Sequence, residues 1–511
     1  MAAAGPEQIA LHATFLRDSI TTHIQTLASA AEKENSSSTE AREISVYLRT
    51  RPLLPNEIER NSVNAAVVHG DDLILYKPEI NYKGPRISPI VTQADASFGP
   101  EDGNQRVYQL ALAELIPLTL GGGLGSVFAY GQTGSGKTYT MSGMQELVAA
   151  DVFRLAEERG GHYEFKFAAF ELLGNDVRDL LDNRKPLKIL EDKFGNVEVP
   201  DAKDYIVTSK DQYLQLVTAA AALRATESTL KNDTSSRSHA VYRLTCRNTR
   251  LPSVKEGTLY LLDLAGSEST RDSKEHDKAR LLETREINRS LMTLKDCIRS
   301  RALASTRSSA HIHIPYRQSK LTLLLKDAFE LSAPRHCRTA VIAHVSPNLL
   351  DASHSANTLK YVAPLKIPPP TTAPRPDPDD PQIWTHETAR SWVRSKIPRS
   401  AEMLPNILVR EEEAGLQLAA MSEEEFMERC LSTGVIGEKK AKAVYLAMWK
   451  LVVDARLRRR ERETGGGKVK VVKKVKPEAY VRFTDERVED GDEKTRVLLE
   501  SHSSWWDGEG K

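Results

Sequence analysis

Cysteine is scarce in this chain of 511 residues, which has four, Cys246, Cys297, Cys337 and Cys430, and no Cys-x-x-Cys pair. This spacing argues against a disulfide framework and a structural zinc site, and it suits a reducing compartment. No apolar run reaches the about 18–20 residues that a membrane-spanning helix needs. The first residues also lack the basic start and apolar stretch of a signal peptide. We therefore expect a soluble intracellular protein without a membrane span.

A net charge of either sign is lacking too, because 71 Lys and Arg residues balance 70 Asp and Glu residues to within one charge. A polyanionic partner would therefore have to meet a local basic patch. Hydrophobic residues make up 40% of the chain, which is enough for a sizeable core and excludes disorder along the whole length. The length itself predicts two to four domains.

Periodicity and composition divide the chain into five segments. An apolar stripe at helical spacing predicts an N-terminal helical extension over residues 1–41. Strand-like runs interleaved with helical stretches predict an α/β domain with a central, mostly parallel sheet over 42–368. A proline-rich linker over 369–381 cannot continue a helix. A helical domain over 382–463 and a flexible tail over 464–511, first basic and then acidic, complete the chain.

One segment of the α/β domain matches the phosphate-binding pattern G-x-x-x-x-G-K-[ST], directly after the expected strand 126–130. Glycines let successive backbone N–H groups converge on phosphate oxygens, and the loop opens onto a helix N-terminus. Lys137 would reach the β- and γ-phosphates of a nucleotide, and the Thr138 hydroxyl would hold Mg²⁺. A glycine-rich surface turn is the alternative, but a strand before the loop and a helix after it favour nucleotide binding. The loop residues are Gly131, Gln132, Thr133, Gly134, Ser135, Gly136, Lys137 and Thr138.

Two later segments supply what such a loop needs to sense a γ-phosphate. Residues 232–239 form a hydroxyl-rich stretch before an expected strand. Asp263 directly follows another expected strand, 259–262, where a carboxylate can serve a bound Mg²⁺ through water. Gly266 would offer a bare backbone N–H to the γ-phosphate. Each segment alone would be an ordinary polar loop, but their order after the phosphate-binding loop indicates one site.

Six motifs in this order resemble those of the kinesin motor domain, over nearly two thirds of the chain. They are Arg49-Thr50-Arg51-Pro52, the strand and phosphate-binding loop from Phe128, Ser235-Ser236-Arg237-Ser238-His239, Asp263–Glu268, Glu286–Leu291 and Ile314–Thr322. The resemblance implies a P-loop ATPase that uses ATP and Mg²⁺ and binds tubulin.

Site roles follow from the resemblance. Arg49, Arg51 and Pro52 would frame the adenine, with Tyr139 stacking on its other face. Ser236 would join Thr138 around Mg²⁺. The implied switch residues are Asn232, Ser235, Ser236, Arg237, Asp263, Gly266 and Glu268, with an Arg237–Glu268 ion pair closing around ATP.

The filament-facing helix is expected at about 283–300. Its basic residue Lys295, together with Arg317 and Lys320, would contact the acidic surface of tubulin, although each is equally compatible with a solvated charged face. Because a proline-rich linker follows residue 366 and no heptads pair two heads, we do not expect hand-over-hand walking.

Local features favour the kinesin-13 group, the microtubule depolymerases. They are the stretch Leu294–Arg299, the length of the loop before Asn288, and Leu190-Glu191-Asp192. Two features oppose it: the early hairpin 77–83 has no Lys-Val-Asp tip, and residues 1–41 lack a strongly basic neck.

Residues 382–463 resemble a SAM domain, with an unrelated helical bundle as the alternative. A SAM-like domain would self-associate or bind a partner protein. The basic stretch 456–476 could hold the acidic tails of tubulin or be a solvated linker, and nucleic acid is not an expected partner.

We therefore expect a microtubule-stimulated ATPase, located on cytoskeletal microtubules and on the spindle, that acts at microtubule ends. The alternative is a nucleotide-gated tether that recruits partners through its SAM-like domain without depolymerising.

Overall fold

The computed structural model describes residues 5–29, 43–81, 84–191, 197–230, 237–250, 256–267, 278–306, 312–329, 336–366, 378–398, 400–410, 413–432 and 434–463. The predicted flexible tail and most of the predicted proline-rich linker therefore lie outside the described residues.

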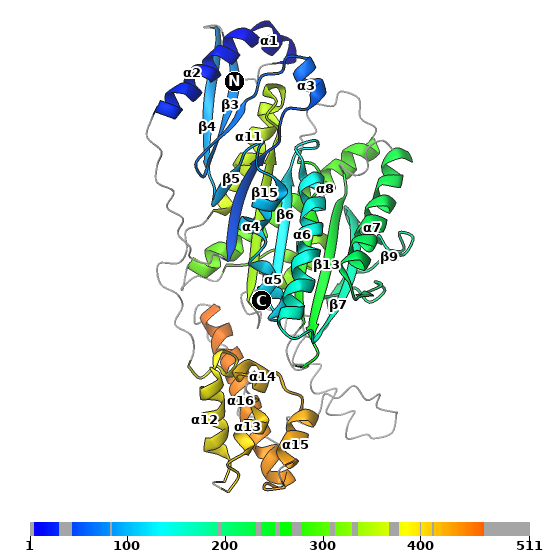
Figure 1. The fold of residues 1–511 in the computed structure, drawn as a ribbon, viewed down its shortest axis with the longest axis vertical. Coiled ribbons are helices and arrows are strands. Elements are labelled where there is room, and N and C mark those ends of the chain that lie inside the picture. Colours follow the sequence, from blue (N-terminus) through cyan, green and yellow to red (C-terminus); the bar gives the residue numbers. More distant parts are fainter. Residues whose placement is uncertain are drawn as a thin grey trace, which may run out of the picture. The chain divides into compact units, whose positions relative to one another are not determined.

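A mixed sheet forms the centre of residues 43–366 (Figure 1), with the strand order β5-β1-β15-β6-β14-β13-β7-β8-β9 and β12 paired to β7. From β5 to β14 every pairing is parallel, and from β14 to β9 every pairing is antiparallel. The strands are β1 (Ile44–Thr50), β5 (Ala96–Phe98), β6 (Leu124–Gly131), β7 (Tyr163–Leu173), β8 (Asp176–Asp179), β9 (Pro186–Leu187), β12 (Tyr205–Val207), β13 (His239–Asn248), β14 (Gly257–Asp263) and β15 (Cys337–Val345). The predicted α/β class with a central sheet is confirmed, and the sheet is mixed, with its parallel pairings between β5 and β14.

Strands β1, β6, β14 and β15 form the parallel centre of the sheet, and the expected strands 126–130 and 259–262 fall within β6 and β14. Every residue of β6 and of β14 is buried. Such strands are covered on both faces, which explains why they are continuous apolar runs without alternation. Their carboxyl ends, at Gly131 and Asp263, meet at one edge of the sheet.

Helices cover both faces of the sheet and divide its core in two. Val127 and Ala129 of β6 point into the core made with α4–α7, whereas Phe128 and Tyr130 point into the core made with α8–α11. The helices are α4 (Asn104–Ala111), α5 (Leu115–Leu120), α6 (Lys137–Glu158), α7 (Lys210–Leu230), α8 (Lys278–Thr306), α9 (Lys320–Leu324), α10 (Lys326–Phe329) and α11 (Ala352–Val362), with the short turns η3 (Tyr316–Gln318), η4 (Leu349–Asp351) and η5 (Ala363–Leu365).

A smaller antiparallel sheet of β2 (Ala66–His69), β3 (Asp72–Asn81) and β4 (Gly84–Gln93) lies beside α3 (Pro55–Glu59) and carries the N-terminal helices α1 (Pro6–Leu11) and α2 (Ala13–Ser29) (Figure 1). Leu16 and Ile20 are buried in the core that β3 shares. Arg17 donates to the Asn61 carbonyl over 2.9 Å. The apolar stripe read from the sequence is therefore a face that packs onto the α/β domain. A separate hairpin pairs β10 (Leu190–Glu191) with β11 (Val197–Glu198).

Residues 378–463 form a helical bundle with a hydrophobic core of its own. Its elements are η6 (Pro381–Ile383), α12 (His386–Lys396), α13 (Leu404–Leu408), α14 (Gly415–Ala420), α15 (Glu423–Leu431) and α16 (Glu438–Glu463). Phe426 and Cys430 of α15 are fully buried, and Met448 of α16 packs with them. Ser422 caps α15 by accepting the Glu425 N–H, and three glutamates in the first turn favour the same helix start.

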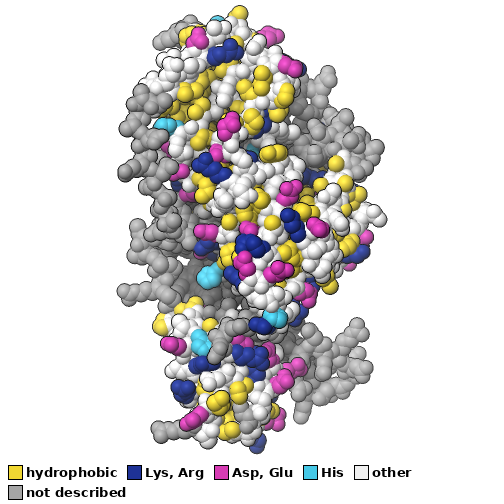
Figure 2. Space-filling model, viewed as in Figure 1, with side chains coloured by type: hydrophobic (Ala, Val, Ile, Leu, Met, Phe, Trp, Pro, Cys, Tyr) yellow, Lys and Arg dark blue, Asp and Glu magenta, His cyan; other side chains and the backbone are white. Residues whose placement is uncertain are grey.

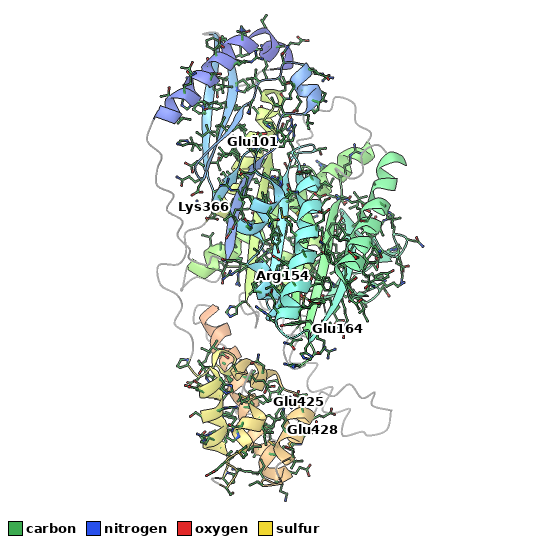
Figure 3. All side chains as sticks on the ribbon, in the orientation of Figure 1. Glu101, Arg154, Glu164, Lys366, Glu425 and Glu428 are labelled. Carbon is green, nitrogen blue, oxygen red and sulfur yellow. The ribbon has the colours of Figure 1, made fainter. Side chains whose placement is uncertain are left out.

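The surface mixes both charge signs. On the face shown in Figure 2, Lys and Arg side chains stand among Asp and Glu side chains, as the balanced net charge suggests. Arg154 on α6 (Figure 3) is a typical case, since it pairs with Asp151 and Glu158. Among the described residues, no helix is both long enough and apolar enough to cross a membrane.

Candidate nucleotide-binding site

The phosphate-binding loop joins the end of β6 to the start of α6. Gly131, Gly134 and Gly136 have φ values of 150°, 75° and 101°, which side-chain-bearing residues rarely adopt. At Gly131 a β-carbon would also collide with the carbonyl of His344 on β15. The glycine spacing noted in the sequence is thus required by backbone conformation at three points.

Lys137 is the first residue of α6 and is 7% exposed. Its Nζ donates to the carbonyls of Gly131 and Gln132, both over 2.9 Å, so the ammonium lies inside the curve of the loop. The Ser135 hydroxyl also donates to the Gln132 carbonyl, over 2.7 Å. The loop is therefore closed around a cation at the amino end of a 22-residue helix, an arrangement that favours an anion.

Thr138 meets Asp263 across this edge of the sheet. The Thr138 hydroxyl donates to Asp263 Oδ2 over 2.8 Å, and Asp263 is 2% exposed. The backbone after Asp263 follows the loop, since the Ser267 N–H donates to the Gly131 carbonyl over 3.1 Å. Asp263 Oδ1 is buried and has no hydrogen-bond partner among the described residues.

Arg224 of α7 is a member of the site that the sequence did not indicate. Its guanidinium, 6% exposed, donates to Asp263 Oδ2 over 2.7 Å and to the Ser238 carbonyl over 2.7 Å. Burial alone would lower the pKa of Arg224, but the Asp263 carboxylate raises it overall. Arg224 therefore stays charged and ties the end of β14 to the segment that contains Arg237.

Glu171 of β7 extends this network and was also missed. The Ser238 hydroxyl donates to Glu171 Oε1 over 2.7 Å, and Arg184 pairs with the same carboxylate at 2.7 Å. A single carboxylate within the otherwise apolar run 167–173 was the available signal, because a buried charge needs a partner.

The adenine side of the predicted site contains an exposed ring beside a buried guanidinium. Tyr139 is 69% exposed, and the Arg49 guanidinium lies 5.6 Å from its ring centroid. Arg49 is itself held by Asn104 Oδ1 at 2.6 Å and by the Thr140 hydroxyl at 2.8 Å. The structure thus brings Arg49 and Tyr139 together, and the bonds to Asn104 and Thr140 hold Arg49 in place.

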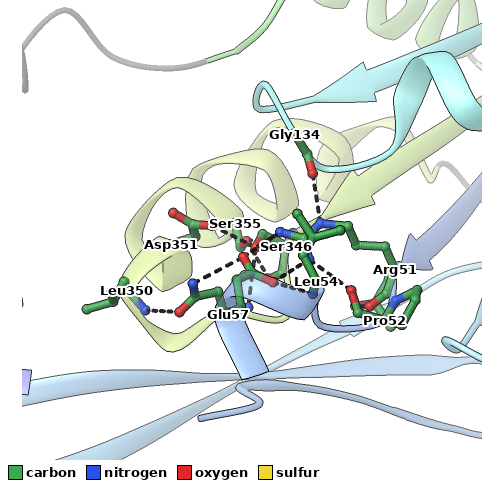
Figure 4. A network of polar contacts seen from close by, with 11 residues as sticks. Arg51, Pro52, Leu54, Glu57, Gly134, Ser346, Leu350, Asp351 and Ser355 are labelled. Atoms are coloured by element: carbon green, nitrogen blue, oxygen red, sulfur yellow. Dashed lines mark hydrogen bonds and ion pairs between the residues drawn. The ribbon is translucent and has the colours of Figure 1, made fainter. Parts of the chain in front are cut away.

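Arg51 links the loop to two other elements (Figure 4). Its Nε donates to the Gly134 carbonyl over 2.7 Å, while its two terminal nitrogens donate to the carboxylate of Glu57 on α3 over 2.7 and 2.8 Å. It also reaches the Ser346 hydroxyl at 3.1 Å, after β15. The Arg51 hydrogen bond lowers the pKa of Glu57 to about 2. The carbonyl of Pro52 accepts from the same guanidinium, so Pro52 lies beside the loop.

The predicted filament contacts Lys295, Arg317 and Lys320 lie on α8, η3 and α9, three elements that contact one another. Lys295 on α8 is half-buried, with its Nζ 5.0 Å from the ring centroid of Tyr361. Arg317 is 68% exposed at its side chain and makes a two-point ion pair with Glu191 at 2.7 and 2.8 Å. Lys320 begins α9. Helix α8 spans Lys278–Thr306, beyond the expected 283–300 at both ends.

Four predicted switch residues, Asn232, Ser235, Ser236 and Glu268, lie outside the described residues. Of the remaining three, Arg237 lies next to Ser238 of the buried network, and Gly266 lies between Ala265 and Ser267 along the loop. Asp263 contacts the Thr138 hydroxyl and the Arg224 guanidinium.

The fold and this edge of the sheet define a P-loop nucleotide-binding domain. The family described as the kinesin motor domain matches residues 49–366, more than half of the chain. The chain therefore belongs to the kinesin motor domain family, whose members are microtubule-associated ATPases.

Relatives are similar over the same region. Diatom spindle kinesin-1 of Cylindrotheca fusiformis is 35% identical over 63% of this chain and 50% of that protein. Kinesin-like protein KIN-13B of Arabidopsis thaliana is 33% identical over 72% of this chain and 53% of that protein. Human kinesin-like protein KIF24 is 35% identical over 66% of this chain and 24% of that protein. The chain thus spans about half the length of the first two and a quarter of the third.

Proposed function

We propose that this protein is a microtubule-stimulated ATPase that couples hydrolysis to microtubule binding and acts at microtubule ends. The observation that carries the proposal is the convergence of the Lys137 loop, Thr138 and Asp263 at the carboxyl ends of β6 and β14, the edge where α/β folds bind ligands.

The residues present fit a Mg²⁺–nucleotide complex. Asp263 has a buried oxygen without a hydrogen-bond partner among the described residues, and the Thr138 hydroxyl lies beside its other oxygen. Mg²⁺ is held in such sites by one or two protein oxygens together with phosphates and waters. No cluster of three metal-ligating side chains is found in the described part of the chain, which agrees with this mode. When bound, Mg²⁺ would neutralise charge on the β- and γ-phosphates.

Each loop residue then has a definite task. Lys137 exchanges its two carbonyl partners for phosphate oxygens, and the N–H groups of the glycines hold the same oxygens in place. Ser236 is proposed to join Thr138 beside Mg²⁺, and the Arg237–Glu268 pair to position the attacking water. Catalysis here is positioning and electrostatic stabilisation.

The adenine is proposed to stack on the exposed ring of Tyr139. Pro52, also exposed, would contact the opposite face, and Arg49 would border the base from its buried position. Arg51 fixes the position of Pro52 relative to the loop, because its guanidinium donates to the carbonyls of both Gly134 and Pro52.

Action at microtubule ends is supported by the similarity to the Arabidopsis KIN-13B and rice KIN-13A proteins. The described part of the hairpin β3–β4 includes Lys77–Asn81 and contains no Lys-Val-Asp triplet, while Tyr82 and Lys83 lie outside the described residues. Helix α8 with Lys295, together with Arg317 and Lys320, is the proposed filament surface. A cytoskeletal and spindle location follows, and the similarity to a protein named diatom spindle kinesin-1 agrees with it.

The bundle of α12–α16 is proposed to be SAM-like and to self-associate or bind a partner protein. Its support is an all-helical fold that ends in the 26-residue helix α16. A tether that grips microtubules without shortening them is the second function, favoured by the missing triplet.

Fluorescence imaging of stabilised microtubules with full-length protein and ATP tests the proposal. Shrinkage from the ends is the expected result. Constant length with ATP-dependent binding would overturn the depolymerase function and leave the tether, and gliding along the surface would indicate a translocating motor.

A further inference from the structure

His239 lies where three elements of the proposed ATPase meet. It begins β13, directly after Ser238 of the buried network, and it is 2% exposed. Its Nδ1 accepts the backbone N–H of Ala265, in the loop after Asp263, over 3.0 Å. Its Nε2 lies 2.8 Å from the hydroxyl of Ser290 on α8. One imidazole therefore bridges the nucleotide-sensing loop and the proposed filament helix.

The direction of every hydrogen bond in this bridge is fixed by chemistry. A backbone N–H can only donate, so Nδ1 carries no proton and the ring proton is on Nε2. Nε2–H therefore donates to Ser290 Oγ, whose own proton goes to the Ile287 carbonyl over 2.7 Å. The result is a one-way series from Ala265 through His239 and Ser290 into the backbone of α8.

Burial makes the bridge difficult to break. Ala265 is 0% exposed and Ser290 4%, so water cannot replace a lost partner. A buried polar group that loses its hydrogen bond keeps its full desolvation cost. Burial, with a smaller contribution from the Arg224 charge, lowers the pKa of His239 to about 3, which agrees with a neutral ring. A shift of the Ala265 backbone must therefore move the ring and Ser290 with it, or lose a buried bond.

We propose that His239 is a positioning residue whose bond to Ser290 couples the backbone at Ala265 to helix α8. Through this bond the nucleotide state of the site sets the position of α8, and binding of a microtubule to α8 acts back on the site with equal coupling. The inference rests on the proposed function, because it specifies how ATP hydrolysis and microtubule binding are linked.

Two single variants and their combination test the bond in the full-length protein. Ser290→Ala removes the acceptor, while His239→Asn keeps an acceptor for the Ala265 N–H and loses the reach to Ser290. The measurement is the ratio of ATP hydrolysis with saturating microtubules to hydrolysis without them. We expect this ratio to fall about tenfold in each single variant and no further in the double variant, because both remove one coupling contact. Basal hydrolysis of Ser290→Ala stays within about twofold of the wild type.

Tyr361→Phe is the matched control. The Tyr361 hydroxyl donates to the Leu291 carbonyl, so this change removes a buried hydrogen bond to the same helix from an element outside the switches. It should leave the stimulation ratio unchanged, and thermal unfolding of all variants separates lost coupling from lost folding.

Failure of the proposed role of His239 and failure of the proposed ATPase function give different results. An unchanged ratio in folded Ser290→Ala and His239→Asn, effects that add in the double variant, or an equal loss in Tyr361→Phe would each overturn the role of His239. A wild-type protein whose ATP hydrolysis microtubules do not stimulate would instead overturn the proposed function.

Discussion

The motor body and the helical bundle each bury a carboxylate against an arginine, yet the two sites differ in what they leave open. In the bundle, Glu413 is 1% exposed and both of its oxygens are bonded to Arg429, at 2.6 and 2.8 Å, with the Arg410 N–H also on Oε2. In the motor, Asp263 meets Arg224 through one oxygen, and its other oxygen has no partner among the described residues.

This difference separates a structural ion pair from a binding site. Burial alone would raise the pKa of Glu413, but the hydrogen bonds from Arg429 hold it below its ordinary value. That carboxylate is satisfied within the bundle and has no need of a ligand. Asp263 has an open oxygen at the end of a parallel strand, next to a loop bent by three glycines, and we propose that this oxygen serves Mg²⁺.

The largest effect is expected from Lys137→Ala. This change removes the cation at the centre of the loop, so ATP hydrolysis should fall about a thousandfold, the upper range for loss of one preorganised charge. Phosphate release and binding of a fluorescent ATP analogue measure it. Lys360→Ala, at an exposed lysine of α11, is the control. Hydrolysis that survives in folded Lys137→Ala would place the nucleotide elsewhere.

Arg429→Met tests whether the ion pair in the bundle is purely structural. It leaves Glu413 buried without its partner, which should cost the bundle about 3–5 kcal/mol of stability. ATP hydrolysis should stay at the wild-type rate. Thermal unfolding followed by tryptophan fluorescence reports on the bundle, because Trp384 and Trp392 pack against its core. A loss of hydrolysis equal to the loss of structure would show that the two regions are not independent.

The sequence predicted the centre of the fold and the loop well, for physical reasons. Strands buried on both faces are long apolar runs, so β6, β14 and β15 can be recognised from the sequence. The loop can be recognised because each of its three glycines is required by a positive φ. The partners of buried charges are harder to predict from the sequence, because they can lie far apart along the chain. Arg224 and Asp263, for example, are 39 positions apart.

The sequence placed Lys295 on an exposed filament surface, but the structure also shows it over the buried ring of Tyr361. Whether a lysine packs over an aromatic ring depends on residues distant in the sequence, and a single sequence does not show that Lys295 meets Tyr361. The importance of Glu171 could have been predicted in part, because a lone carboxylate in an apolar strand needs a partner even when the sequence does not identify that partner.

Glu57→Gln tests whether the Arg51 network is structural or part of the site. The pKa of Glu57 in the folded protein is about 2, below its ordinary 4.5, so its ion pair adds stability above about pH 4.5 and loses it as the pH falls towards 2. We expect Glu57→Gln to lower stability by about 1–2 kcal/mol at pH 7, with the gap to wild type closing as the pH falls below about 4.5. Urea unfolding across this range measures it. A gap independent of pH would contradict the ionised pair.

The smallest effect is expected from Glu191→Gln. Arg317 and Lys326 both pair with Glu191, whose pKa the Arg317 hydrogen bonds lower to about 2. Removing this charge leaves more positive potential for an acidic filament, so microtubule affinity should rise about twofold at low salt, an effect that salt screens. Co-sedimentation with microtubules at two salt concentrations measures it. Unchanged affinity at both would remove Arg317 from the filament surface.

The proposed microtubule-stimulated hydrolysis at the Lys137 loop is tested most directly by measuring ATP hydrolysis by the full-length protein across a range of microtubule concentrations. We expect a rate that rises with microtubule concentration to a plateau and is lost in Lys137→Ala. A rate that microtubules do not change, or one that persists without Lys137, would contradict it.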